Sequence, residues 1–172
     1  QACSVLKAHL DDIISLAISP KANFMASGSK DTTIKLWSLQ EDKFFKVLKG
    51  HSDWVKSVVF GPDEKFLISG GQDYTIRFWS IPEGDLITTL KKHSDNVNAV
   101  VICANKDLLL SGSDDQTIRF WSLSEKKPLK TLAAHASYVN ALAISPDENF
   151  FASGSRDNTV KLWSLPEGEL LH

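Results

Sequence analysis

The chain has 172 residues, of which 42% are hydrophobic and 23% are charged, a composition typical of a globular protein. Nineteen Lys and Arg residues against 21 Asp and Glu residues give a formal net charge of −2, so charge gives no reason to expect binding to nucleic acid or to an anionic membrane. No run of 18 apolar residues predicts a membrane span, and no signal peptide is recognisable.

One stretch of sequence occurs four times. Residues 27–38 read SGSKDTTIKLWS, and related sequences follow at 69–80, 111–122 and 153–164. The step is 42 residues each time, and no insertion breaks it. A fixed period in the low forties predicts a stacked repeat architecture.

The period divides the chain into repeats of one kind. We expect a single repeat segment over residues 1–172, with units at about 9–50, 51–92, 93–134 and 135–172. The last strand of the fourth unit is expected to be incomplete. Cys3 and Cys103 lie at different phases of the repeat and make no disulfide framework, so we expect two small buried or half-buried thiols.

Each unit contains four short apolar runs separated by turn residues. In the second unit the runs are 55–60, 66–69, 75–79 and 85–90, and the turns between them are rich in Gly, Pro and Asp. No run is long enough for a typical helix, and none shows a spacing of 3.6 residues. The pattern therefore predicts a four-stranded antiparallel meander in each unit.

The first and fourth strands of a unit differ in character. The first strand carries small residues at alternate positions, such as Ser15 and Ala17, with apolar residues between them. A strand that is apolar on both faces is expected to be buried on both faces, near the axis of a radial array. The fourth strand is more polar and more variable, as expected for an outer strand. The third strand carries a basic residue in every unit (Lys35, Arg77, Arg119, Lys161), which we interpret as a solvated strand edge.

The sequence resembles the WD-repeat β-propeller family over its whole length. The motif that carries the resemblance is His, then Ser-Gly, then Asp-x-Thr-Ile/Val-Lys/Arg-Leu/Phe-Trp, in four copies. The Gly-His pair of the family occurs only at Gly50-His51, and its Trp-Asp pair is Trp-Ser in every copy. The resemblance implies an all-β fold of four-stranded antiparallel blades around a central channel, in which one blade's outer strand comes from the neighbouring repeat.

The resemblance also implies a buried, hydrogen-bonded His-Ser-Asp-Trp tetrad in each repeat. Three of these residue types make hydrolytic triads, but four identical copies at one period favour a structural role. A buried imidazole must satisfy both nitrogens, which an Asp and a Ser can do while the Ser also meets the Trp indole. The expected tetrads are His9, Ser27, Asp31, Trp37; His51, Ser69, Asp73, Trp79; His93, Ser111, Asp115, Trp121; and His135, Ser153, Asp157, Trp163.

The sequence gives no sign of a cofactor or metal. The repeated histidines are 42 residues apart, and no His or Cys pair has the spacing of metal ligands. The Ser-Gly turns lack the form of a phosphate-binding loop. By analogy with the family, we expect a non-catalytic scaffold for protein–protein interaction. The alternative is a regulatory or sensory propeller module of a larger protein that carries an enzyme domain elsewhere.

Positions that vary between repeats are the candidates for partner binding, because the constant positions serve folding. In the family that the chain resembles, three such positions per repeat line the face that carries the loops between repeats. Trp54 is the one tryptophan outside the periodic set and Tyr138 is its counterpart, and aromatic residues often anchor interfaces. The candidate residues are Asp12, Ile14, Lys30, Trp54, Lys56, Gln72, Asn96, Asn98, Asp114, Tyr138, Asn140 and Arg156.

Four blades are fewer than the six to eight that the resemblance implies for a closed ring. An open array would expose apolar blade faces. Residues 4–7 match the end of a fourth strand and residues 168–172 match the beginning of one, so one interpretation is that two copies exchange strands and close an eight-bladed ring. The other interpretation is a four-repeat piece of a longer chain. The cytoplasm is the default location for a chain without a disulfide framework.

Overall fold

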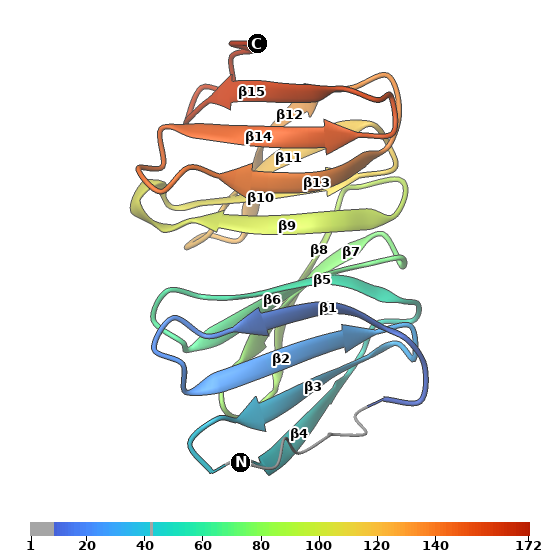
Figure 1. Cartoon of the computed structure of the whole chain (residues 1–172), viewed down its shortest axis with the longest axis vertical. Coiled ribbons are helices and arrows are strands. Elements are labelled where there is room, and N and C mark those ends of the chain that lie inside the picture. The colour runs from blue at the N-terminus through green and yellow to red at the C-terminus, as the bar shows by residue number, and fades with distance from the viewer. Residues whose placement is uncertain (1–8, 42) are drawn as a thin grey trace, which may run out of the picture.

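The computed structural model describes residues 9–41 and 43–172, in which the regular secondary structure is β-strand apart from one short 3₁₀ turn (Figure 1). The first two sheets contain β1 (Ile13–Ile18), β2 (Phe24–Ser29), β3 (Thr33–Ser38) and β4 (Lys43–Lys49), then β5 (Val55–Phe60), β6 (Phe66–Gly71), β7 (Thr75–Ser80) and β8 (Leu86–Lys91). The third and fourth sheets contain β9 (Val97–Cys103), β10 (Leu108–Ser113), β11 (Thr117–Ser122) and β12 (Lys127–Ala133), then β13 (Val139–Ile144), β14 (Phe150–Ser155) and β15 (Val160–Ser164).

Each sheet is an antiparallel meander, which confirms the predicted fold class. The strand orders are β1-β2-β3-β4, β5-β6-β7-β8, β9-β10-β11-β12 and β13-β14-β15, and we refer to these sheets as blades 1 to 4. A single bridge between Trp163 and Leu170 follows β15 in blade 4. The one helix in the described residues is a 3₁₀ turn at Ala104–Lys106, so no helix there is long enough to cross a membrane.

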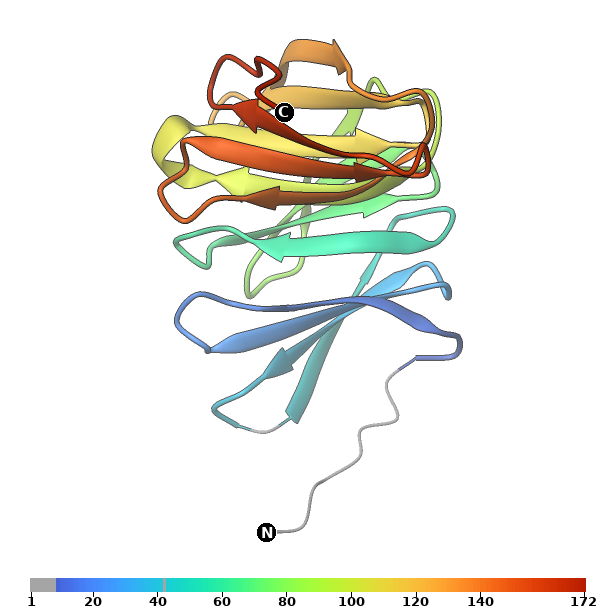
Figure 2. The same cartoon turned by 45° about the horizontal axis from the view of Figure 1, so that its top comes forward.

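The blades follow one another in chain order along the long axis, from blue to red in Figures 1 and 2. Strands β1, β9 and β13 all point to the left in Figure 1, so the start of each of these strands lies on the right. Because the strands are antiparallel, the end of the second strand and the start of the third lie at that same edge. Loops from all four blades therefore line one edge of the molecule.

The hydrophobic core lies between successive blades. The first strand of blades 2 to 4 packs mainly on the first and second strands of the blade before it, and its apolar side chains also join a cluster with the third strand. For example, Val55 and Val58 of β5 share a cluster with Ile34 of β3. Gly28 allows this approach, since a Cβ there would lie 2.8 Å from the Val55 Cγ1 atom. Burying each such aliphatic side chain is worth about 1.5–3 kcal/mol, so the interblade contacts supply much of the stability.

The expectation that every first strand is buried on both faces is wrong for β1. Leu16 and Ile18 are both 63% exposed, because no described residue packs on the outer face of that strand. Blade 4 shows the matching effect on its open side, where Val160 is 77% exposed while its counterpart Ile34 in blade 1 is 0% exposed. The two ends of the blade stack are thus apolar, and no described residue covers them.

Strand ends differ slightly from the expected ones. Strand β6 runs to Gly71 rather than ending at residue 69, and β8 spans Leu86–Lys91 rather than residues 85–90. Cys103 ends β9 and is fully buried with a free thiol. Cys3 lies outside the described residues.

Candidate functional site

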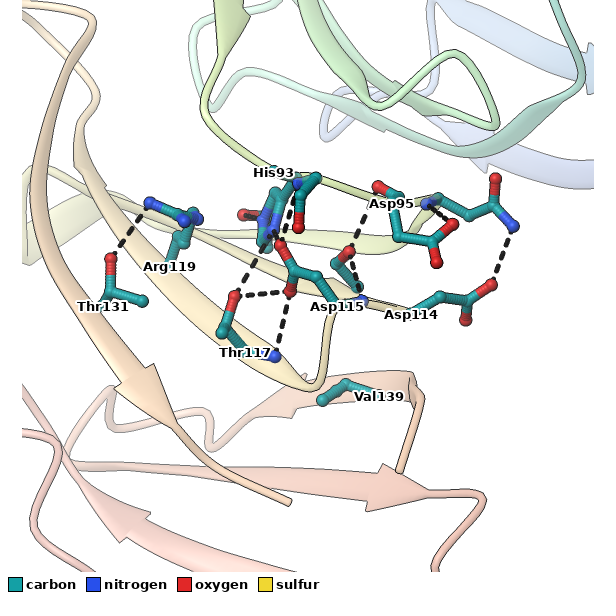
Figure 3. A network of polar contacts seen from close by, with 12 residues as sticks. His93, Asp95, Asp114, Asp115, Thr117, Arg119, Thr131 and Val139 are labelled. Carbon is teal, nitrogen blue, oxygen red and sulfur yellow. Dashed lines mark hydrogen bonds and ion pairs between the residues drawn. The ribbon is translucent and has the colours of Figure 1, made fainter. Parts of the chain in front are cut away.

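The structure brings the four residues of each repeat's tetrad together. The His Nδ1 to Asp carboxylate distances are 2.8, 2.9, 2.7 and 2.9 Å in blades 1 to 4. The His Nε2 to Ser Oγ distances are 2.8, 2.7, 2.7 and 2.7 Å. The Trp Nε1 to Ser Oγ distances are 3.3, 2.9, 2.9 and 2.8 Å. Figure 3 shows the surroundings of His93 and Asp115 in blade 3.

Chemistry fixes the direction of these hydrogen bonds. An indole N–H can only donate, so Trp79 donates to the Ser69 hydroxyl oxygen. The Ser69 hydroxyl then donates to Nε2 of His51, which leaves the ring proton on Nδ1 to be donated to the Asp73 carboxylate. Every polar hydrogen of the tetrad is thereby used. Ser69 is 0% exposed, so this hydroxyl offers no side from which a substrate could approach.

The Asp of each tetrad also holds two loops together. Asp73 accepts hydrogen bonds from the Ser52 backbone N–H at 3.1 Å and from the Thr75 backbone and hydroxyl at 3.2 and 2.7 Å. Burial acts to raise the pKa of Asp73, but the hydrogen bonds from His51, Thr75 and Ser52 outweigh it. The pKa of this carboxyl therefore lies well below its usual range, and the ionised form is built into the fold.

The tetrads define the edge at which partner binding was expected. Each His precedes a first strand and each Asp lies between a second and a third strand, so all four tetrads lie at the edge where those strands begin or end. We call this the tetrad edge. The sequence also places its variable positions beside these two loops.

The structure pairs two of the variable positions in every blade. The backbone N–H of the residue before the tetrad Asp donates to the carbonyl of the residue three after the His. These hydrogen bonds join Lys30 to Asp12, Gln72 to Trp54, Asp114 to Asn96 and Arg156 to Tyr138, at 2.9, 2.8, 2.9 and 2.9 Å. Each blade therefore displays one variable pair at the same place on a constant backbone.

The side chains of these pairs differ in chemistry. Lys30 forms an ion pair with Asp12 at 2.8 Å and lies 4.6 Å above the ring of Trp54 in blade 2. Arg156 lies 5.5 Å from the ring of Tyr138. These two cation–aromatic contacts hold large side chains in fixed positions on the surface.

Blade 3 replaces the aromatic pair with a polar one. Asp114, labelled in Figure 3, accepts from Asn96 at 2.8 Å and from Asn98 at 2.5 Å. Asn98 also donates to the Val139 carbonyl of blade 4 at 3.0 Å. The other candidates make no side-chain hydrogen bond within the described residues. Ile14 and Asn140 are exposed, while Lys56 and Gln72 are half-buried.

The opposite edge carries two carboxylates that the sequence analysis missed. Glu64 of blade 2 accepts from the Lys21 backbone and the Asn23 amide of blade 1, both at 2.6 Å. Glu148 of blade 4 accepts from the Ala104 and Asn105 backbone N–H groups of blade 3 at 3.2 and 2.9 Å. The sequence Pro-Asp-Glu in the second and fourth repeats was the available signal.

Glu148 also explains the state of the free cysteine. The Cys103 Sγ atom lies 3.1 Å from Glu148 Oε2. Burial and the neighbouring carboxylate raise the pKa of Cys103 to about 12, so the thiol is neutral and weakly reactive. In the part of the chain that the structure describes, no group of three or more His, Cys, Asp or Glu side chains is placed to hold a metal ion.

The third-strand basic residues are less solvated than expected. The Arg77 side chain is only 14% exposed and lies 3.6 Å from Asp73. Lys161 donates to the Ala134 carbonyl at 2.6 Å, and Arg119 donates to the Thr131 hydroxyl at 3.1 Å (Figure 3). These side chains belong to the tetrad edge rather than to a free strand edge.

A match to a protein-family model identifies the family of this chain. The model described as "WD domain, G-beta repeat" matches residues 1–38, 42–80, 84–122 and 126–164. The chain belongs to this family. The match to 42–80 covers β4 to β7, so each of its repeats joins the outer strand of one blade to three strands of the next.

Two solved structures are similar over almost the whole chain. "Structure of U3-55K" matches with a TM-score of 0.90 and 28% identity, covering 98% of this chain and 53% of that one. "Crystal structure of RRP9 WD40 repeats" matches with a TM-score of 0.90 and 28% identity, covering 98% of this chain and 52% of that one. The chain thus spans about half the length of these WD-repeat structures.

Proposed function

We propose that this chain is a non-catalytic platform for protein–protein interaction, which binds its partner at the tetrad edge. The observation that carries the proposal is the contrast between two sets of residues at that edge. The tetrads are the same in all four blades, while the hydrogen-bonded pair beside each tetrad changes from Lys-Asp to Gln-Trp, Asp-Asn and Arg-Tyr. A constant frame with one variable pair per blade suits selective recognition.

The strongest anchors in this proposal are the aromatic residues. Trp54 is half-buried under Lys30, and its indole N–H donates to no described residue. Tyr138 is 37% exposed beside Arg156. Trp, Tyr and Arg carry a large share of binding energy in interfaces, and side chains held in place before binding lose less entropy on binding.

The non-catalytic part of the proposal is supported by the tetrads themselves. Their Ser, His and Asp groups are fully engaged in hydrogen bonds inside the protein, as described above for Ser69 and His51. The same arrangement occurs four times, which a single reaction centre has no use for. The location in the cytoplasm remains part of this proposal on the default stated above.

Crosslinking to the full chain, followed by mass spectrometry, would identify a partner whose affinity can then be measured with purified components. Trp54→Ala and Tyr138→Ala are each expected to weaken binding about tenfold or more. Leu86→Ala is the matched control, because Leu86 is also a large exposed apolar residue but lies on the outer strand β8. Unchanged affinity in both aromatic variants would contradict the proposal.

Self-association is a further part of the proposal. It is supported by the exposed Leu16 and Ile18 on β1 and the exposed Val160 in blade 4, whose counterparts lie between blades elsewhere. Light scattering of the 172-residue chain tests it. A defined dimer that Leu16→Asp converts to a monomer is the expected result, and a monomer at all concentrations would contradict it.

A further inference from the structure

A polar groove lies at the tetrad edge of blade 2. It has a volume of about 340 Å³ and is lined by the turn before β7, the end of β8 and the loop that precedes β5. The lining residues that matter here are Ser52, Tyr74, Arg77 and Lys91. The groove is separate from the variable pairs but lies at the same edge of the molecule.

The guanidinium of Arg77 keeps unused hydrogen-bond donors in this groove. Its Nε donates to the Thr75 hydroxyl at 3.3 Å, while its Nη2 lies 3.6 Å from the nearest Asp73 oxygen, too far for a hydrogen bond. The Asp73 oxygens already accept from His51, Ser52 and Thr75, so they do not draw Arg77 closer. Neither Nη group donates to a described residue.

The residue at position 50 leaves room beside these donors. A Cβ on Gly50 would lie 3.1 Å from the Arg77 Nη1 atom and 2.9 Å from the Trp79 ring. The corresponding positions in the third and fourth repeats are Lys92 and Ala134, which both carry a Cβ. Blade 2 therefore exposes more of its arginine than a repeat with a side chain at that position would.

A second cation completes the groove. Lys91 is exposed at the end of β8 and has no carboxylate within ion-pair distance among the described residues. The groove thus contains two cations and one carboxylate, and that carboxylate is already engaged by the tetrad. An anion entering the groove would meet net positive charge and a guanidinium whose planar donors match a carboxylate.

We propose that this groove binds a carboxylate side chain, from a Glu or Asp in an extended acidic segment of the protein partner. Arg77 receives the carboxylate through its Nη groups, Lys91 adds a second positive charge, and the exposed ring of Tyr74 flanks the bound segment. This inference rests on the proposed function, since it names the chemistry of a partner bound at the tetrad edge.

The other blades offer internal comparisons. The equivalent groove of blade 1 is lined by Lys35 and Lys49, which lack the planar fork of an arginine. Blade 3 has an arginine, but Arg119 already donates to Thr131, and Ala133 stands where blade 2 has Lys91. Arg119 is therefore the matched control for Arg77.

The test uses the full chain labelled with ¹⁵N-arginine and three capped pentapeptides, Gly-Gly-X-Gly-Gly with X as Glu, Gln or phosphoserine. Titration of the Glu peptide is expected to shift the Arg77 Nε–Hε resonance saturably, with a Kd in the range of about 1–10 mM. The Gln peptide is expected to bind at least about tenfold more weakly. Equal shifts with Glu and Gln would overturn the proposal, and so would a phosphoserine peptide binding more than about tenfold tighter than Glu, which would make this a phosphate site.

Variants distinguish the groove of blade 2 from the other residues of the tetrad edge. Because Arg77→Gln removes the reporting resonance, binding to the variants is followed by saturation transfer from the protein to the Glu peptide. Arg77→Gln is expected to abolish this transfer, while Arg119→Gln leaves it unchanged. Lys91→Ala, an exposed change that does not depend on how Arg77→Gln folds, is expected to raise the Kd about threefold. Undiminished binding in Arg77→Gln, or an unchanged Kd in Lys91→Ala, would overturn the site, whereas the dependence of partner affinity on Trp54 would still test the platform separately.

Discussion

Removing one tetrad carboxylate tests the structural role of the tetrads. Asp73→Ala deletes the acceptor for four hydrogen bonds, donated by His51, by the Ser52 backbone and by the Thr75 backbone and hydroxyl. The Ser52 N–H is near solvent and can bond to water. The His51 ring, 1% exposed, and the Thr75 groups, in a residue that is 7% exposed, are left without partners in the interior.

The expected cost follows from these buried donors. A buried polar group that loses its partner costs about 1–3 kcal/mol. Because water can enter the space left by the carboxylate, we expect the low end for each of the two groups, or a loss of about 2–4 kcal/mol in the free energy of unfolding. For a chain of this size that corresponds to a fall in Tm of about 5–15 °C.

Thermal unfolding followed by circular dichroism measures the effect. Asp85→Ala is the control, since Asp85 is an exposed carboxylate of the same blade whose side chain makes no hydrogen bond, and its change is expected to stay within about 0.5 kcal/mol. Equal unfolding midpoints for Asp73→Ala and the parent chain would refute the reasoning.

Three further predictions concern the same framework. The folded-state pKa values of the tetrad aspartates lie below their unfolded values. Their contribution to stability is therefore present above about pH 5 and is lost as the pH falls toward the depressed folded-state values. The urea midpoint of the parent chain should drop between pH 5 and pH 3, and that of Asp73→Ala should drop less. Glu64→Ala should lower the urea midpoint by less than Asp73→Ala does, and should speed amide hydrogen exchange at residues 21–23. Exchange rates there that equal those of the parent chain would contradict the contact between blades 1 and 2. Cys103 should react with iodoacetamide at least about a hundredfold more slowly in the folded chain than in urea, as measured by mass spectrometry, and fast labelling of the native chain would show that the thiol is not sealed in.

Most of the fold could be predicted from the repeat period. It predicted the meander of each blade because strand lengths, turns and core positions recur at one spacing, and the structure shows that meander in all four blades. What the period could not predict was the environment of the end blades. The apolar β1 has the sequence of a buried strand, yet Leu16 and Ile18 are exposed because burial depends on a neighbouring blade, which no local pattern encodes.

The candidate site could be predicted only in part, because contacts between blades are not encoded in any one repeat. The variable residues could be found by comparing repeats, but their pairing could not, since the contact between Lys30 and Trp54 joins two blades and depends on the angle between them. The contact made by Glu64 was hidden because its partners, the Lys21 backbone N–H and the Asn23 amide, lie in another repeat. Arg77 looked like a solvated residue because its burial depends on the tetrad loop above it.

The most direct test of the account compares two variants of blade 2 in two assays, with one purified partner. Trp54→Ala should weaken partner binding about tenfold or more while leaving Tm nearly unchanged. Ser69→Ala, which leaves Nε2 of the buried His51 ring and the Trp79 indole N–H without a partner, should lower Tm by about 5–15 °C while leaving the affinity nearly unchanged at temperatures well below the transition. The reverse pattern, with stability lost in Trp54→Ala and binding lost in Ser69→Ala, would contradict the division between a structural tetrad and a variable binding edge.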